Sequence, residues 1–174
     1  MATKDKKENE IIEQNESKEL DLDKKVVIKN VTTWNTGFSR IEGTGDVSLV
    51  PKGSMKIQRS ELIAQSQSGN KSFNGLDGKG SHADIYIEDA PTRIELGYET
   101  KNRKQLIFTD ELVKDVFSIK DQDEFEKKFK EAFVTILEKM AVMDAINRVG
   151  INDYSKIRFA ETYTGLKVPE KEQG

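Results

Sequence analysis

The chain has 174 residues, which is enough for one ordinary domain with a core of its own. Apolar residues make up 35% and charged residues 34%, and the net charge of −3 lacks the basic excess of a dedicated nucleic-acid binder. The absence of cysteine excludes disulfides and thiolate metal sites. The first ten residues are highly charged and contain no apolar run, and no stretch approaches the ~18–20 apolar residues of a membrane span, so we expect neither a secretory signal nor a membrane segment.

The two ends of the chain are strongly polar. Residues 1–25 carry eight acids, six lysines and no aromatic side chain. Such segments bury too little apolar surface to offset the entropy that ordering costs. The sequence therefore predicts three parts: a disordered charged arm over 1–24, a single α+β domain over 25–166 that is β-rich in 25–90 and helical in 91–166, and a flexible tail over 167–174.

The β-rich part shows short apolar runs between turn residues. A strand begins at Val26, and Met55 and Ile57 alternate along another. Ser60 has the position of an N-cap for a helix over 61–68. Turns are expected at 35–37, 43–46, 51–53 and 76–81, a short strand at 47–50 and an extended segment at 72–75. This pattern favours a small sheet or barrel.

The residue periodicity changes near Asp89. Residues 82–88 alternate between apolar and polar side chains, which predicts a half-buried strand. Asp89 can cap a short helix that ends at Gly97, and Thr109 can cap a helix over 110–117. A further strand is expected at 105–108.

The longest predicted element is one amphipathic helix over residues 122–149, capped by Asp121 and closed by Gly150. Its apolar residues recur every three or four positions and form one stripe, made of Phe125, Phe129, Phe133, Ile136, Met140, Met143 and Ile146. The stripe is either core or an oligomer interface, whose candidate residues are Phe125, Phe129, Phe133, Met140 and Met143. A last helix begins at Asp153 or Ser155 and ends at Gly165.

No catalytic or metal-binding motif emerges. His82 is the single histidine, and the nucleophile motif G-x-S-x-G is missing. The Gly78-Lys79-Gly80-Ser81 segment fails the phosphate-loop pattern, because Phe73 and Gly80 occupy positions that require glycine and Ser or Thr. The acids lack calcium-loop spacing. We therefore expect a non-enzymatic protein with no cofactor and no metal.

A binding role for loops and aromatic side chains is the alternative. Aromatic rings can stack on the bases of single-stranded nucleic acid, and nearby cations can contact its phosphates. The candidate binding loop consists of Trp34, Phe38, Arg40, Phe73, Lys79 and His82. The same aromatic residues would otherwise fill the core of the β-rich part.

Several short segments carry a family resemblance. They are Thr33-Trp34-Asn35, Gly45-Asp46-Val47, Phe73-Asn74-Gly75, Gly80-Ser81-His82-Ala83 and Thr162-Tyr163-Thr164-Gly165. Together they resemble small uncharacterised proteins of phages and prophages of low-GC Gram-positive bacteria, over roughly residues 25–166. The resemblance implies a virion component, capsid-associated or head–tail, and it carries over no catalytic residue.

The expected function is accordingly structural. We expect an assembly protein that forms a homo-oligomer and contacts other virion proteins, in the virion or the host cytoplasm. The alternative is a single-stranded nucleic-acid-binding accessory protein of phage replication.

Overall fold

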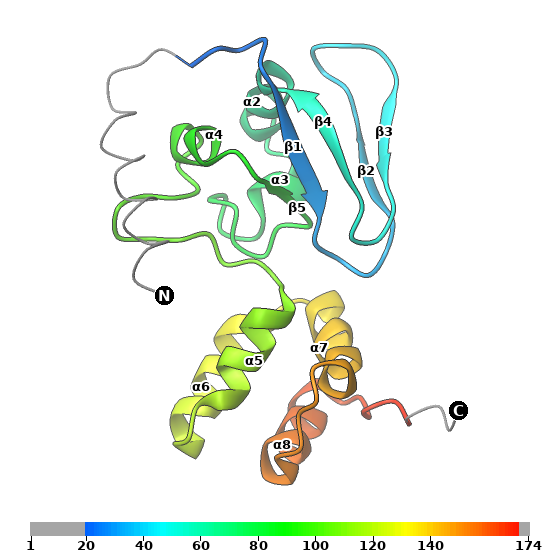
Figure 1. The fold of residues 1–174 in the computed structure, drawn as a ribbon, viewed down its shortest axis with the longest axis vertical. Helices are drawn as coiled ribbons and strands as arrows, with labels where there is room; N and C mark the ends of the chain where they lie inside the picture. Colours follow the sequence, from blue (N-terminus) through cyan, green and yellow to red (C-terminus); the bar gives the residue numbers. More distant parts are fainter. Residues whose placement is uncertain (1–19, 171–174) are drawn as a thin grey trace. The chain divides into compact units, whose positions relative to one another are not determined.

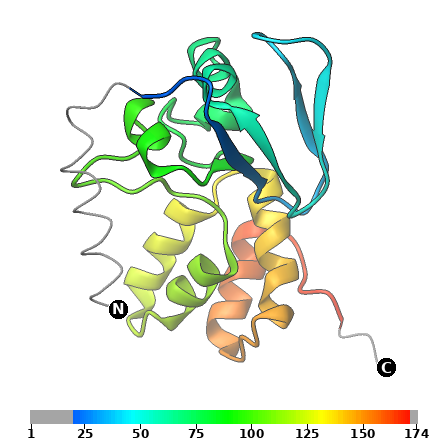
Figure 2. The ribbon, with the colours of Figure 1, turned by 45° about the horizontal axis from the view of Figure 1, so that its top comes forward.

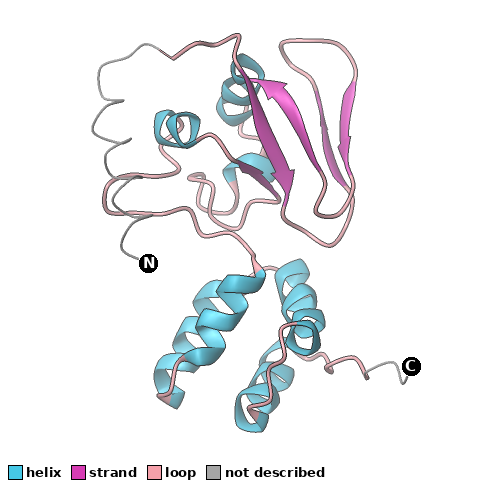
Figure 3. Cartoon of the chain, viewed as in Figure 1, coloured by secondary structure: helices cyan, strands magenta, loops and turns pink. Residues whose placement is uncertain are grey.

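The computed structural model describes residues 20–170 and confirms the α+β class (Figures 1 and 3). The predicted arm lies outside the described residues over 1–19, as does the predicted tail over 171–174. The chain divides into two compact units between Ile107 and Phe108. We call the described parts the β unit (residues 20–107) and the helical unit (residues 108–170). That both unfold as one cooperative domain stays a prediction.

The β unit contains two small antiparallel sheets. Strand β1 (Lys25–Asn30) is the centre of the first, with β4 (Ser54–Gln58) on one side and β5 (Ile85–Ile87) on the other. The second is the hairpin of β2 (Thr36–Ser39) and β3 (Asp46–Leu49), which Figure 2 shows beside the first sheet. The strands therefore form open sheets, not a closed barrel.

Helices follow the strands of the β unit closely. Helix α2 (Arg59–Gln67) directly continues β4, and α4 (Ala90–Glu95) is capped by Asp89, whose carboxylate accepts from the Thr92 N–H. Four sequence predictions are wrong in the β unit. Strand β2 begins inside the predicted turn at 35–37, and α2 begins at Arg59, so Ser60 is not its N-cap. The predicted extended segment at 72–75 is largely helical, because the Asn70 side chain caps α3 (Lys71–Asn74), and residues 105–108 form no strand.

The core of the β unit lies on one face of the first sheet. Val26 and Ile28 of β1 point to it and meet Leu62 of α2 and Phe73 of α3. The expected burial of Ala83, Ile85 and Ile87 is confirmed, but the strand predicted over 82–88 is shorter and spans only Ile85–Ile87. Tyr98 completes this core, so the segment after α4 belongs to the β unit.

The helical unit contains four helices with well-defined ends. They are α5 (Asp110–Ser118), α6 (Gln122–Ala132), α7 (Ile136–Arg148) and α8 (Tyr154–Thr164). Thr109, Asp121 and Asp153 cap three of them with their side chains, and Gly165 ends α8 in the left-handed conformation. These three helix starts and the end of α8 agree with the sequence prediction.

The predicted single helix over 122–149 is wrong, because the chain breaks between Ala132 and Ile136. Thr135 starts α7 with a capping box: its hydroxyl accepts from the Glu138 N–H at 3.0 Å, and Glu138 Oε2 accepts from the N–H groups of Thr135 and Val134. Phe133 leaves helical geometry, with φ −123° and ψ 79°. Its ring packs 4.8 Å from the Phe129 ring, so the break folds one apolar stripe back on itself.

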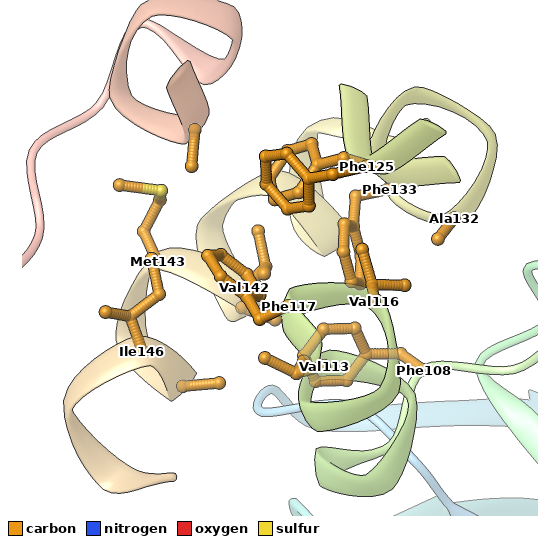
Figure 4. Packing of buried hydrophobic residues seen from close by; sticks show 14 residues of the cluster. Phe108, Val113, Val116, Phe117, Phe125, Ala132, Phe133, Val142, Met143 and Ile146 are labelled. Carbon is orange, nitrogen blue, oxygen red and sulfur yellow. The ribbon is translucent and has the colours of Figure 1, made fainter. Parts of the chain in front are cut away.

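Five of the fourteen buried residues in the core of the helical unit are phenylalanines (Figure 4). Phe129 is fully buried and its ring lies within 6 Å of five other rings, those of Phe117, Phe125, Phe133, Phe159 and Tyr163. Most of these pairs meet edge to face, the favourable arrangement for aromatic rings.

Candidate protein interface

The two phenylalanines of the predicted binding loop are core residues. Phe38 and Phe73 are buried, and their ring centroids lie 5.0 Å apart in an edge-to-face contact. They therefore offer no stacking platform for bases. Trp34 is half-buried, while Arg40 and Lys79 are exposed on separate loops.

His82 occupies a strained turn. Its φ is 61°, in the left-handed region that few side chains adopt, and its backbone N–H donates to the Leu106 carbonyl at 2.8 Å. The side chain is half-buried. Among residues 20–170, no group of three or more His, Asp or Glu side chains has the arrangement to hold a metal ion.

The glycine-rich loop before His82 is closed by its own hydrogen bonds. Asp77 Oδ1 accepts from the backbone N–H groups of Lys79 and Ser81, at 2.7 and 3.1 Å. Burial raises the pKa of Asp77, but these hydrogen bonds outweigh it and lower the pKa below its usual value. A Cβ at Gly80 would come within 2.8 Å of the Tyr98 ring, so this glycine is needed for close packing. Because these N–H groups already donate to Asp77, they are not available to bind a phosphate.

A buried asparagine fixes the Trp34 loop. Asn30 is fully buried, and its amide donates to the carbonyls of Trp34 and Val50 at 2.7 and 3.0 Å. Its Oδ1 accepts from the N–H and the hydroxyl of Thr32. One side chain thus ties the loop after β1 to the end of β3. The sequence analysis missed Asn30, because nothing local marks an asparagine at a strand end as buried.

Most of the predicted interface stripe is inside the helical unit. Phe125, Phe129, Phe133 and Met143 are at most 2% exposed and belong to the unit's own core. Met140 is 49% exposed. Only Met140 of the five is therefore positioned to meet a partner.

Met140 lies in a group of exposed apolar side chains where α7 begins. We call Val134, Ile136, Leu137 and Met140 the apolar corner; their exposed fractions are 43%, 76%, 40% and 49%. The capping box fixes the direction of α7, and the opposite side of the helix buries Ala141, Val142, Ala145 and Ile146. Positions 136, 137 and 140 share a helix face, so their side chains form one surface.

The apolar corner is distinct from the other exposed apolar side chains. Among residues 20–170 the other large ones are scattered over loops and helix ends: Leu22, Ile41, Val50, Leu76, Tyr154 and Leu166. Singly exposed apolar residues are ordinary on protein surfaces, whereas contiguous groups mark contact sites.

A sequence signal for the corner existed. Val134-Thr135-Ile136-Leu137 places too many apolar residues in a row for one amphipathic face, and Thr135-x-x-Glu138 is a capping-box pattern. Together they mark a helix start with apolar residues left outside.

Comparison with known proteins gives no match: no family model fits the sequence, and neither the curated proteins nor the solved structures show significant similarity. None of the helices described over residues 20–170 combines the length and apolar character that crossing a bilayer requires.

Proposed function

We propose that this protein is a non-enzymatic structural or assembly protein whose apolar corner docks on a second copy of the same chain. The supporting observation is the exposure of Ile136, Leu137 and Met140 next to a fully packed core. Leaving such a surface in water is unfavourable by roughly 25 cal/mol per Å² of apolar area, and a contact between copies recovers that free energy.

A second copy is favoured over a different partner because the patch is single. A two-fold contact between copies uses the same surface on both, whereas a head-to-tail contact needs a second, complementary patch. The other large exposed apolar side chains among residues 20–170 stand singly in the sequence. Two α7 helices packed antiparallel would bring Leu137 and Met140 of one copy against the same residues of the other.

The resemblance to small phage proteins adds a location to this proposal, the phage particle. It favours a virion component, capsid-associated or head–tail, located in the virion or the host cytoplasm and in contact with other virion proteins. Mass spectrometry of particles purified from cells that carry the gene tests this extension, and absence of the chain from complete particles contradicts it.

Light scattering coupled to size exclusion tests the contact between copies. We expect the wild-type chain to have the mass of a dimer or higher oligomer. Ile136→Asp places a charge in the patch, while an acid in the first turn of α7 suits the helix dipole and preserves folding. We expect this variant to dissociate at least tenfold more readily.

Tyr154→Gln is the matched control, because Tyr154 is 71% exposed in the same unit but lies outside the apolar corner. It should leave the oligomer unchanged. A monomeric wild-type chain at its highest soluble concentration, or equal dissociation of both variants, contradicts the proposed contact.

A further inference from the structure

The first sheet of the β unit has a second face, opposite its core. Val26 and Ile28 of β1 point to the core, so Lys25, Val27 and Lys29 alternate onto the other face. The antiparallel register places Lys56 of β4 directly beside Val27. Figure 1 shows β4, β1 and β5 side by side in this sheet.

Three lysines on this face are evenly spaced. Lys56 is level with Val27, halfway between Lys25 and Lys29 along the strand. At about 3.3 Å per residue, the three Cα positions are spaced by about 6.6 Å along the strand direction, with Lys56 displaced sideways by the strand spacing of about 4.8 Å. Lys25 and Lys56 are exposed and Lys29 is half-buried. A regular row of charges of this kind fits a linear polyanion with one charge per repeat.

The three lysines have no acidic partner among the described residues. Within residues 20–170 none of the three forms an ion pair, whereas the neighbouring Lys24 pairs with Asp89 at 3.0 Å. Glu88, the residue after β5, is exposed, and its backbone N–H donates to the Val27 carbonyl. The register places it level with Val27, on the side of β1 opposite Lys56.

The charge of the chain is unevenly divided. Residues 20–107 contain thirteen Lys and Arg against eleven Asp and Glu, a net charge of +2. Residues 108–174 contain eleven against fourteen, a net charge of −3. Residues 1–19 add −2, so the positive balance belongs to the described β unit alone.

We propose that this sheet face binds the phosphate backbone of single-stranded nucleic acid. The lysine row contacts successive phosphates, and Val27 supplies apolar surface between the charges for the sugars and bases. An extended strand follows the row along β1. An acidic peptide is the competing ligand, but its carboxylates sit on flexible side chains that gain less from a fixed, even spacing. This surface shares no residue with the apolar corner, so the proposal stands independently of the contact between copies.

Fluorescence anisotropy with a labelled oligothymidylate at low salt tests the proposal. The variant Lys25→Gln, Lys29→Gln, Lys56→Gln should bind at least tenfold more weakly than the wild-type chain. Because each phosphate contact on a single strand adds about 0.7 to the salt slope, the triple variant should lose about 2 from the slope of log K against log salt. Glu88→Gln removes the acid beside Val27 and should tighten binding.

The matched control is Arg40→Gln, Lys71→Gln, Lys79→Gln. It removes the same charge from exposed positions outside the sheet face and includes the two cations of the sequence-predicted binding loop. We expect it to retain binding within about threefold, since scattered surface charges contribute little. Thermal melts of both triple variants check that folding is intact.

Three results would overturn the proposal. The first is no binding of the oligonucleotide by the wild-type chain at low salt. The second is an equal or larger loss in the control variant, which would assign binding to the loops. The third is equally tight, lysine-dependent binding of polyglutamate, which would make the face an acidic-peptide surface.

Discussion

The β unit and the helical unit are each stabilised internally by a different kind of interaction. Among the described residues, eight of the ten buried polar side chains belong to the β unit and only Glu138 and Lys156 to the helical unit. The β unit has a smaller apolar core, and its buried polar groups hydrogen-bond to loops and helix ends. The helical unit closes around a cluster of aromatic rings.

Arg59 illustrates how the β unit is connected. It is 2% exposed, and its guanidinium donates to the Thr92 hydroxyl, the Asp89 carboxylate and the Asp21 carbonyl. Glu61, also buried, accepts from the N–H groups of the loop after β2. Strands of three to six residues bury little apolar surface, so side-chain hydrogen bonds specify where the loops lie. Different substitutions and conditions should therefore destabilise the two units.

The largest effect is expected for Phe129→Ala in the helical unit. Deleting a fully buried ring with five ring neighbours leaves a cavity, and we expect a loss of about 3–5 kcal/mol in the free energy of unfolding. Far-UV circular dichroism follows the helices, and Trp34, the single tryptophan, reports on the β unit.

Circular dichroism and Trp34 fluorescence of this variant together test whether the two units unfold independently of each other. Because the two apolar cores are separate clusters, the Trp34 fluorescence transition should stay in place while the helical transition moves. Equal shifts of both would instead support the single cooperative domain that the sequence predicts. Phe129→Leu is the control and should cost much less.

Asn30→Asp should be the most damaging conservative change in the β unit. It replaces an amide that donates to three carbonyls with a carboxylate that cannot donate. We expect a loss of about 3 kcal/mol, measured by urea unfolding with Trp34 fluorescence. Asn35→Asp, at an exposed position of the same loop, should change stability by less than about 0.5 kcal/mol; a similar loss for both variants would contradict the role of Asn30.

Acid should weaken the β unit through Asp89. Burial raises the pKa of Asp89, but hydrogen bonds from Thr92, Lys24 and Arg59 outweigh it and lower the pKa from 3.8 to about 2. A carboxylate with a depressed folded-state pKa stabilises the fold above the unfolded-state value and loses that contribution as the pH falls through the folded-state value. The contribution, about 2 kcal/mol, should thus be present above pH 3.8 and disappear towards pH 2.

Asp89→Asn isolates this contribution, because asparagine caps α4 as well as aspartate does. Urea unfolding of the variant at neutral pH should show the loss of about 2 kcal/mol, and its stability should depend less on pH in the acid range. Identical acid profiles for variant and wild-type chain would rule Asp89 out as the sensitive group.

The smallest effect is expected for Thr135→Ala at the start of α7. Loss of the capping hydroxyl should cost about 1 kcal/mol, measured by chemical denaturation with circular dichroism. Thr135→Ser keeps the hydroxyl and should be close to neutral; if it destabilises as much as alanine, the capping box is not what sets the break.

Local chemistry explains which elements the sequence predicted. Thr109, Asp121 and Asp153 were expected to cap helices because a cap acts within three residues of itself. The same logic applied at Thr135 would have ended the predicted long helix, but the regular spacing from Phe125 to Ile146 masked it. The periodicity continues across the break, but Ile136 and Met140 of the stripe stay exposed while its other members turn toward the core.

The sequence alone therefore determined the α+β class, most helix ends and the inward side of most strands, since these depend on neighbours along the chain. Only the tertiary structure decided whether side chains whose partners are distant in the sequence are buried or exposed. Asn30 and Arg59 are buried, and Ile136 and Met140 are exposed. Phe38 and Phe73 lie in the core and do not form the alternative base-stacking surface. The tertiary structure also aligned Lys56 with β1, because the register of paired strands is set by contacts across the sheet.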